Sequence, residues 1–224
     1  MKKILLSLAL LVLALNVNAQ YKVGDIYNEN GVKGMVVIVT DGGMHGLVIS
    51  MTSYNKKWLD DKGVKFDTEA FFEDDGMKNM EAIEKYIEAN NKSWADFPIF
   101  EWARSLGDGW YIPAKDELME IGKSLCGGST KYNHKMVKNY SKLLKKAKGD
   151  SLIDDGFGGT KALRRMYSST EAEGGAVYSL CLKLSAGAIL IGGNPRGNIE
   201  MIPMNKSHSG GKFGGAGSRA VHKF

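Results

Sequence analysis

Histidine and cysteine are the side chains that most often bind metals or act as nucleophiles, and this 224-residue chain holds four histidines and two cysteines. None of the histidines has a second histidine or a cysteine at a spacing that zinc sites use. The chain also lacks a Gly-x-Ser-x-Gly elbow, a phosphate-binding loop and a dinucleotide fingerprint. We therefore expect no metal, nucleotide or serine-nucleophile chemistry. The histidines are His45, His134, His208 and His222.

The two cysteines, Cys126 and Cys181, leave two alternatives open. A single disulfide is chemically permitted in an exported chain. Two buried thiols that pack as small hydrophobic groups fit equally well, because Cys181 lies in an apolar strand pattern and Cys126 ends a helix. A catalytic cysteine is disfavoured, since neither residue has a histidine or a Cys-x-x-Cys partner nearby.

Clustered carboxylates occur in two glycine-containing stretches, Glu73–Gly76 and Asp154–Gly156. Neither has the alternating spacing of an EF-hand calcium loop. We expect acidic turns without metal. Paired carboxylates could also serve a glycosidase, but nothing in the sequence selects one pair.

The first 19 residues have the features of a secretory signal. Lys2 and Lys3 precede an apolar run, and Val17-Asn18-Ala19 is a small-residue cleavage site before Gln20. The run is shorter than the roughly 20 residues of a spanning helix, so we expect an exported chain without a membrane span. Cleavage removes two lysines and no acid, which lowers the formal charge from +5 to +3.

Lysines concentrate between residues 131 and 148, where seven of them could coat one helix. A nucleic-acid or polyanion site would need this face to be a dedicated patch with aromatic side chains between the lysines. The range contains Tyr132 and Tyr140, and lysine on the outside of an amphipathic helix is the ordinary solution for solubility. For an exported chain the sequence therefore favours an ordinary solvated helix face and no nucleic-acid partner.

Hydrophobic periodicity predicts the elements that must position any site. Apolar runs at 34–40 and 46–51 flank Asp41-Gly42-Gly43 and predict a hairpin, which Trp58 should cover. Helices are expected at 77–89, at 98–106 with Asp96 as cap, at 115–125, and at 130–147. The last of these carries an apolar stripe of Met136, Tyr140, Leu143, Leu144 and Ala147.

The second half of the chain reads mainly as strands and loops. Short strands are expected at 110–112, 166–169, 176–184, 188–191 and 219–222, and loops at 149–160 and 192–217. Helices followed by an antiparallel sheet make an α+β domain. No linker divides the chain, so one domain from residue 20 to 224 is expected, with an insertion at about 130–160.

Three short stretches in a fixed order carry a resemblance to a known family. They are Gly109–Leu118, with its Gly-Trp-x-hydrophobic-Pro-x-x-x-Glu-Leu pattern, then Tyr167–Glu171, and a closing Ser218–Phe224. Together they resemble the C-type-lectin-like domains of exported bacterial proteins, in the group that includes the C-terminal domain of a collagen-like adhesin. The resemblance implies a C-type-lectin-like fold, a twisted antiparallel sheet with helices packed on it and long glycine-rich loops. It implies structural roles for Trp110, Pro113, Glu117, Ser169 and Arg219.

The same resemblance implies a function at the cell surface, in the periplasm or in the medium. We expect a non-enzymatic recognition or adhesion module without cofactor, which binds a glycan or a protein. In lectin-like folds the late loops form the ligand surface, and polar amide and guanidinium groups suit hydroxyl or carboxylate recognition. The expected ligand-binding residues are Asn194, Arg196, Asn198 and His208.

Calcium-dependent sugar binding is disfavoured, because the triplets Glu-Pro-Asn, Gln-Pro-Asp and Trp-Asn-Asp do not occur in the sequence. The fold also resembles formylglycine-generating enzymes, but the two cysteines lack the position of their reactive pair. Two alternatives stay open: a structural subunit of a surface assembly, and a hydrolase or modifying enzyme on the same scaffold.

Overall fold

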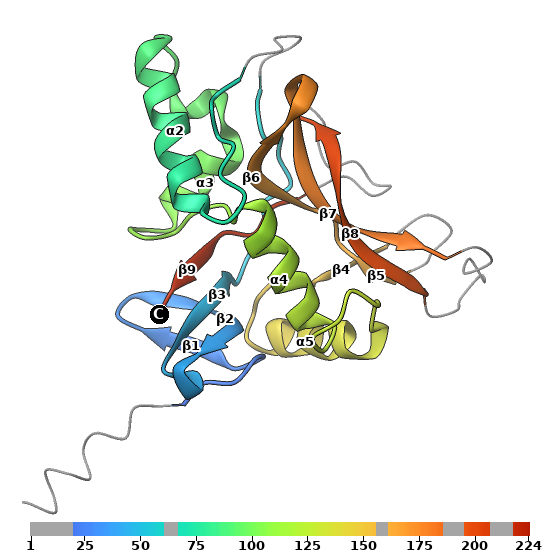
Figure 1. Cartoon of the computed structure of the whole chain (residues 1–224). Helices are drawn as coiled ribbons and strands as arrows, with labels where there is room; N and C mark the ends of the chain where they lie inside the picture. The colour runs from blue at the N-terminus through green and yellow to red at the C-terminus, as the bar shows by residue number, and fades with distance from the viewer. Residues whose placement is uncertain (1–19, 61–66, 156–160, 186–194, 207–216) are drawn as a thin grey trace, which may run out of the picture.

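The computed structural model describes residues 20–60, 67–155, 161–185, 195–206 and 217–224. In these ranges helices and antiparallel sheets confirm the expected α+β class (Figure 1). The expected signal at 1–19 and the expected strand at 188–191 lie outside the described residues. The helices are α2 (Gly76–Ala89), α3 (Pro98–Ser105), α4 (Lys115–Leu125) and α5 (His134–Lys146). The strands are β1 (Ile26–Glu29), β2 (Val32–Thr40), β3 (His45–Ser50), β4 (Ile153–Asp155), β5 (Lys161–Leu163), β6 (Met166–Ala172), β7 (Ala176–Leu184), β8 (Gly197–Asn205) and β9 (Val221–Lys223).

The first sheet joins the two ends of the described chain in the order β1-β2-β3-β9. The predicted hairpin is present as β2 and β3, which are connected through Asp41–Gly43. Strand β9 pairs with β3, so the C-terminus lies against the N-terminal hairpin (Figure 1). The expected strand at 110–112 is reduced to one bridge, in which Tyr111 pairs with Val221.

A second sheet, β6-β7-β8, contains a strand that the sequence analysis placed in a loop. The expected 192–217 loop is wrong for Gly197–Asn205, which forms β8 and pairs with the whole of β7. Pro203 lies within this strand. Strand β8 is the edge strand of its sheet, and on its outer side Gly197 O and Ile199 N form hydrogen bonds with segment 130–132. Backbone groups of alternate residues in a strand point to the same side, so the nitrogen of Pro203 also faces outward, where no ladder hydrogen bond is lost.

The described residues bury two hydrophobic clusters, one on each face of the β2–β3 hairpin. Adjacent residues of β2 point to opposite faces, so Val36 joins the first cluster and Met35 the second. Trp58 is fully buried in the first cluster, together with Val36 and Val48 of the hairpin. This dual burial explains why the two strands read as continuous apolar runs.

Helix α4 lies between the two sheets, and the sequence predicted its bounds correctly (Figure 1). Its buried face carries Leu118, Ile121 and Leu125. Gly122 allows the close approach of β7 and β8, because a Cβ there would lie 2.8 Å from Ile199 and 2.9 Å from Leu180. The helix is therefore fixed against both strands by a glycine contact.

Two expected details of the helices are wrong. Asp96 does not cap α3; it accepts a hydrogen bond from Ser93 N at 2.8 Å and closes a separate single turn, while Phe97 precedes α3. On α5 the buried positions are Val137, Ser141 and Leu144, and Leu143 of the predicted stripe is exposed. The buried face of α5 is thus rotated from the predicted apolar stripe and includes Ser141, whose hydroxyl accepts a hydrogen bond from Leu152 N at 3.1 Å.

No helix among the described residues is long and apolar enough to cross a bilayer.

Candidate functional site

The most unusual part of the interior is a run of buried polar residues on β6. Every residue of this strand is buried, including Ser168, Ser169, Thr170 and Glu171. Burying a polar group costs free energy unless the group is hydrogen bonded. The hydrogen-bond partners of these residues therefore show which segments the strand holds in place. Ser169 N donates to Pro113 O at 2.8 Å, and Ser168 O accepts from Trp58 Nε1 at 3.0 Å.

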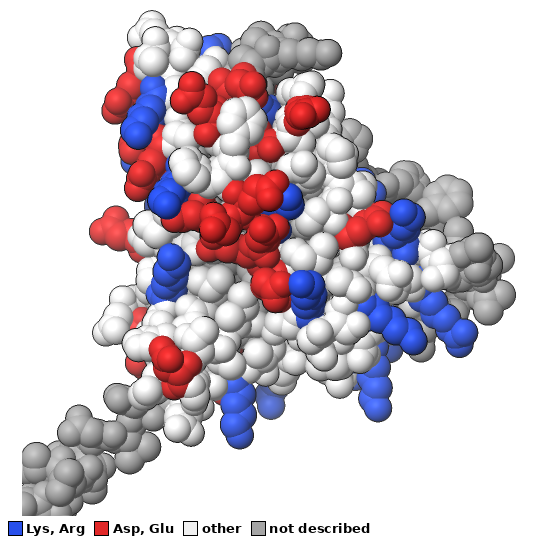
Figure 2. Space-filling view, in the orientation of Figure 1, with Lys and Arg blue, Asp and Glu red and all other residues white. Residues whose placement is uncertain are grey.

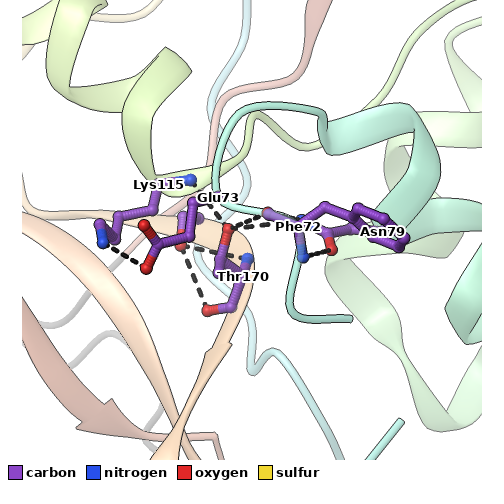
Figure 3. Close-up of polar contacts among 6 residues, drawn as sticks. Phe72, Glu73, Asn79, Lys115 and Thr170 are labelled. Carbon is purple, nitrogen blue, oxygen red and sulfur yellow. Dashed lines mark hydrogen bonds and ion pairs between the residues drawn. The ribbon is translucent and has the colours of Figure 1, made fainter. Parts of the chain in front are cut away.

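Asn79 of α2 connects this polar run to an exposed aromatic residue, Phe72 (Figure 3). The Asn79 side chain is fully buried. Its Oδ1 accepts from Phe72 N at 2.9 Å, and its Nδ2 donates to Phe72 O at 2.7 Å and to Ser169 Oγ at 2.9 Å. Thr170 Oγ1 donates a second bond to Phe72 O at 2.8 Å. The backbone of Phe72 is thus held by three hydrogen bonds from buried side chains.

The segment before Phe72 is attached to β6 in the same manner. Glu171 N donates to Ala70 O at 2.8 Å, and Thr68 N donates to Glu171 Oε2 at 2.9 Å. Between these contacts Glu69 has a φ of 61°, a strained value for a residue other than glycine. We call residues 68–72 the stapled segment. Its irregular backbone is maintained by β6, and strain of this kind is concentrated at functional sites.

A buried ion pair between Glu171 and Lys206 supports the start of the stapled segment, where Thr68 N donates to Glu171. The side chains of Glu171 and Lys206 are almost completely buried and in direct contact, and the ammonium group lies 4.9 Å from the centre of the Trp58 ring. Burial raises the pKa of Glu171, while the charge of Lys206 and the bond from Thr68 N act in the opposite direction. The pair therefore serves to hold the segment.

Glu117 joins the starts of two helices beneath this segment. Its Oε2 accepts from Ala114 N at 2.9 Å and from Gly76 N at 3.1 Å, and its Oε1 accepts from the Tyr111 hydroxyl at 2.8 Å. Ala114 cannot cap α4 with its side chain, so Glu117 supplies the returning half of a capping box. Burial raises the pKa of Tyr111, and its hydroxyl stays a donor at neutral pH.

An open groove of about 590 Å³ lies between the stapled segment and α2. We call it the α2 groove. Phe72, 43% exposed, and the half-buried Tyr86 provide aromatic surface in it. Its volume is within the range of small-molecule sites, which combine apolar rings with a few polar groups. Carboxylate, ammonium and amide groups provide the polar part of the lining: Asp67, Glu69, Glu81, Lys78, Lys85 and Asn90.

The surface around the groove is acidic. Figure 2 shows carboxylates gathered in the upper half of the view, over α2 and the start of α4. Some have structural partners: Asp75 Oδ1 accepts from Met77 N and Lys78 N, both at 3.1 Å, and caps α2. Glu73 pairs with Lys115 at 2.5 Å (Figure 3). The stretch Glu73–Gly76 thus leads into α2, and Asp75 caps the helix.

Of the four expected ligand-binding residues, the structure describes two, Arg196 and Asn198. Asn194 and His208 lie outside the described residues. Arg196 and Asn198 are exposed, but Asn198 lies on β8, bridged to Lys131, and not on a flexible loop. Asn198 lies on a strand because residues 197–205 pair with β7 along its full length.

The residues expected to be structural all have partners within the chain. Trp110 is buried against His222, with ring centres 5.4 Å apart. Pro113 and Ser169 share the hydrogen bond described above, and Glu117 links α2 and α4. Arg219 is buried and donates to four carbonyl oxygens; burial lowers its pKa to about 10. These carbonyls belong to Ser50, Met51, Asp150 and Ser151.

The cysteines and the acidic residues give no reactive or metal-binding centre in the described ranges. Cys126 and Cys181 are free and buried, which corresponds to the two-thiol alternative and not to a disulfide. Burial raises the pKa of both thiols, so they stay protonated at neutral pH. Across the described residues no three histidine, cysteine or acidic side chains are grouped to hold a metal ion.

No protein-family model, no curated protein and no solved structure matches this chain.

Proposed function

We propose that this protein is an exported, non-enzymatic recognition module of C-type-lectin-like fold that binds a glycan in the α2 groove. The observation that carries the proposal is the clamp on Phe72. Buried Asn79 and Thr170 fix the backbone of Phe72, an aromatic residue that is 43% exposed at an open groove. Holding an exposed ring in this way lowers the entropy that a ligand must remove on binding.

The arrangement of the chain ends supports the fold proposal. The closing strand β9 pairs with the N-terminal hairpin, and the Trp110 motif meets β9 through the bridge between Tyr111 and Val221. The motif then leads directly into α4, between the two sheets. Export is supported by the signal pattern at 1–19, and sequencing of the mature protein from its host should begin at Gln20.

The groove chemistry favours a glycan over an apolar ligand. A sugar ring has a face of C–H groups that packs on an aromatic ring, and an edge of hydroxyls that needs donors and acceptors. Phe72 and Tyr86 provide the rings. Carboxylates such as Glu81 accept from hydroxyls, whereas the Asn90 amide can donate and accept.

A non-enzymatic role is supported by how the buried ionisable groups are used. Glu171, Lys206 and Arg219 bond to backbone groups or to each other, and together they hold the scaffold. For the alternative of a subunit that accepts a donor strand, β8 is a poor acceptor edge. Pro203 has no N–H to donate at its outward position.

The groove is tested by a matched pair of aromatic substitutions. Residues 20–224 are screened on a glycan array as wild type, Phe72→Ala and Phe71→Ala. Phe71 is the matched control, because it is 48% exposed and neighbours Phe72 but does not line the groove. We expect Phe72→Ala to weaken binding at least about tenfold, from the loss of roughly 1.5 kcal/mol or more of aromatic burial.

Phe71→Ala should bind within about twofold of the wild type, as expected for a residue outside the contact. Equal losses in both variants would contradict the groove, and so would full binding by Phe72→Ala. If wild-type protein binds no glycan on a broad array, the proposed ligand class is wrong.

A further inference from the structure

The positive and negative charges of this protein, whose formal net charge is +5, are separated into two regions. Residues 67–90, which include α2, contain eight carboxylates and two lysines. Residues 131–148, which include α5, contain seven lysines and no carboxylate. Figure 2 shows the carboxylates in the upper part of the view and lysine and arginine side chains along the lower edge, below the place of α4 in Figure 1.

The lysines of α5 have no ion-pair partner among the residues that the structure describes. All five are exposed, and among the described residues none of them forms a salt bridge: Lys135, Lys138, Lys142, Lys145 and Lys146. Lysines on other elements behave differently, since Lys123 pairs with Glu120 at 2.6 Å and Lys57 with Asp60 at 2.7 Å. Repulsion between the α5 ammonium groups is thus uncompensated within the described chain.

The two helices also match in length and in the spacing of their charges. Helix α2 has 14 residues and α5 has 13, so each is about 20 Å long. On α2 the exposed carboxylates Glu81, Glu84 and Glu88 are separated by three and then four residues. On α5 the spacing of Lys138, Lys142 and Lys145 is four and then three. An antiparallel contact between the two helices therefore brings each carboxylate opposite an ammonium group.

We propose that the exposed face of α5 docks on the acidic face of α2 in a second copy of this chain, giving head-to-tail self-association. The faces are different surfaces of one molecule, so each contact leaves an α2 face free at one end and an α5 face free at the other. Contacts of this heterologous kind extend into open chains or close into rings. The proposal does not rest on the glycan function, and the docking face shares Glu81 with the α2 groove.

The test uses charge reversal followed by mixing. Glu84→Lys with Glu88→Lys makes the α2 face basic, and Lys142→Glu with Lys145→Glu places two carboxylates opposite Glu84 and Glu81 in the antiparallel contact. Glu84 and Glu88 do not line the α2 groove. Sedimentation velocity is run over a range of protein concentrations at about 10 mM and about 1 M salt, where the Debye length is about 30 Å and 3 Å.

We expect the wild type to associate at low salt and to be monomeric at high salt. Each doubly substituted variant should be monomeric alone, and an equimolar mixture of the two should associate again. A wild type that stays monomeric at low salt overturns the proposal. Association that persists in either variant alone also overturns it, because the contact must then be elsewhere. Circular dichroism verifies that each variant is folded, and glycan binding by the monomeric variants is scored separately.

Discussion

Replacing Lys206 by methionine should lower the free energy of unfolding by about 3 to 5 kcal/mol, the cost typical of leaving a buried charge without its partner. Lys206 contacts the carboxylate of Glu171, and both side chains are almost completely buried. In Lys206→Met the carboxylate keeps the bond from Thr68 N but loses its counter-charge. Urea denaturation at neutral pH measures the loss.

The double variant Glu171→Gln with Lys206→Met distinguishes charge from packing. Its neutral amide keeps an acceptor for Thr68 N and removes the buried charge, so most of the lost stability should return. The control is Lys183→Met, which breaks the exposed pair between Lys183 and Glu200, 3.3 Å apart, and should change stability by less than about 1 kcal/mol. A loss below about 1 kcal/mol in Lys206→Met would show that the pair does not anchor the segment.

The same variant has a pH signature. Burial raises the pKa of Glu171, and Lys206 lowers it, so removing Lys206 must raise the pKa further in the folded state. A carboxyl group with a raised pKa in the folded state costs stability when it is ionised. The deficit of Lys206→Met should therefore be largest at neutral pH, and it should shrink as the pH falls toward the ordinary glutamate pKa of 4.5.

Changing Asn79 to aspartate should destabilise the protein by about 3 kcal/mol or more and release Phe72 from its clamp. The side chains have the same shape, but aspartate replaces the amide donor with an acceptor. It would face Phe72 O, which accepts from Nδ2 at 2.7 Å in the wild type. A buried ionised carboxylate opposite a carbonyl oxygen is costly.

Two measurements separate these effects. Urea denaturation gives the stability, and amide hydrogen exchange of Phe72 N–H, which donates to Asn79 Oδ1, reports on the clamp. Asn90→Asp is the control, because Asn90 is exposed at the end of the same helix and bonds only Tyr86 O, at 2.9 Å. It should cost about 1 kcal/mol or less. Unchanged exchange of Phe72 in a folded Asn79→Asp protein would show that other contacts hold the segment.

The helices and the first hairpin were predictable because their information is local. Helix α4 follows Pro113, has carboxylates in its first turn and carries apolar residues on one face, and its bounds were correct. Strand β8 was not predicted, because polar residues among glycines are typical of a loop. Its strand character depends on β7, and the tolerance for proline depends on an edge position that only the assembled sheet defines.

The candidate site was harder to predict because its residues are connected across the fold. Glu171 was recognised within a motif, but its partner Lys206 is 35 residues away with no shared pattern. Asn79 left a weaker signal that was available: it lies four residues before Ile83 and eight before Ile87, on the buried face of α2. A polar residue in an apolar stripe indicates a buried hydrogen-bond junction. Phe71 and Phe72, surrounded by acids, were a second unused signal.

A nitrogen-15 chemical-shift titration of residues 20–224 with the best glycan from the array would locate the bound ligand residue by residue. We predict that the largest chemical-shift changes occur in the stapled segment 68–72 and along α2 between Lys78 and Asn90, because residues of both line the groove. Changes concentrated at Arg196 and Asn198 would place the ligand at the end of the β7–β8 hairpin and contradict the groove.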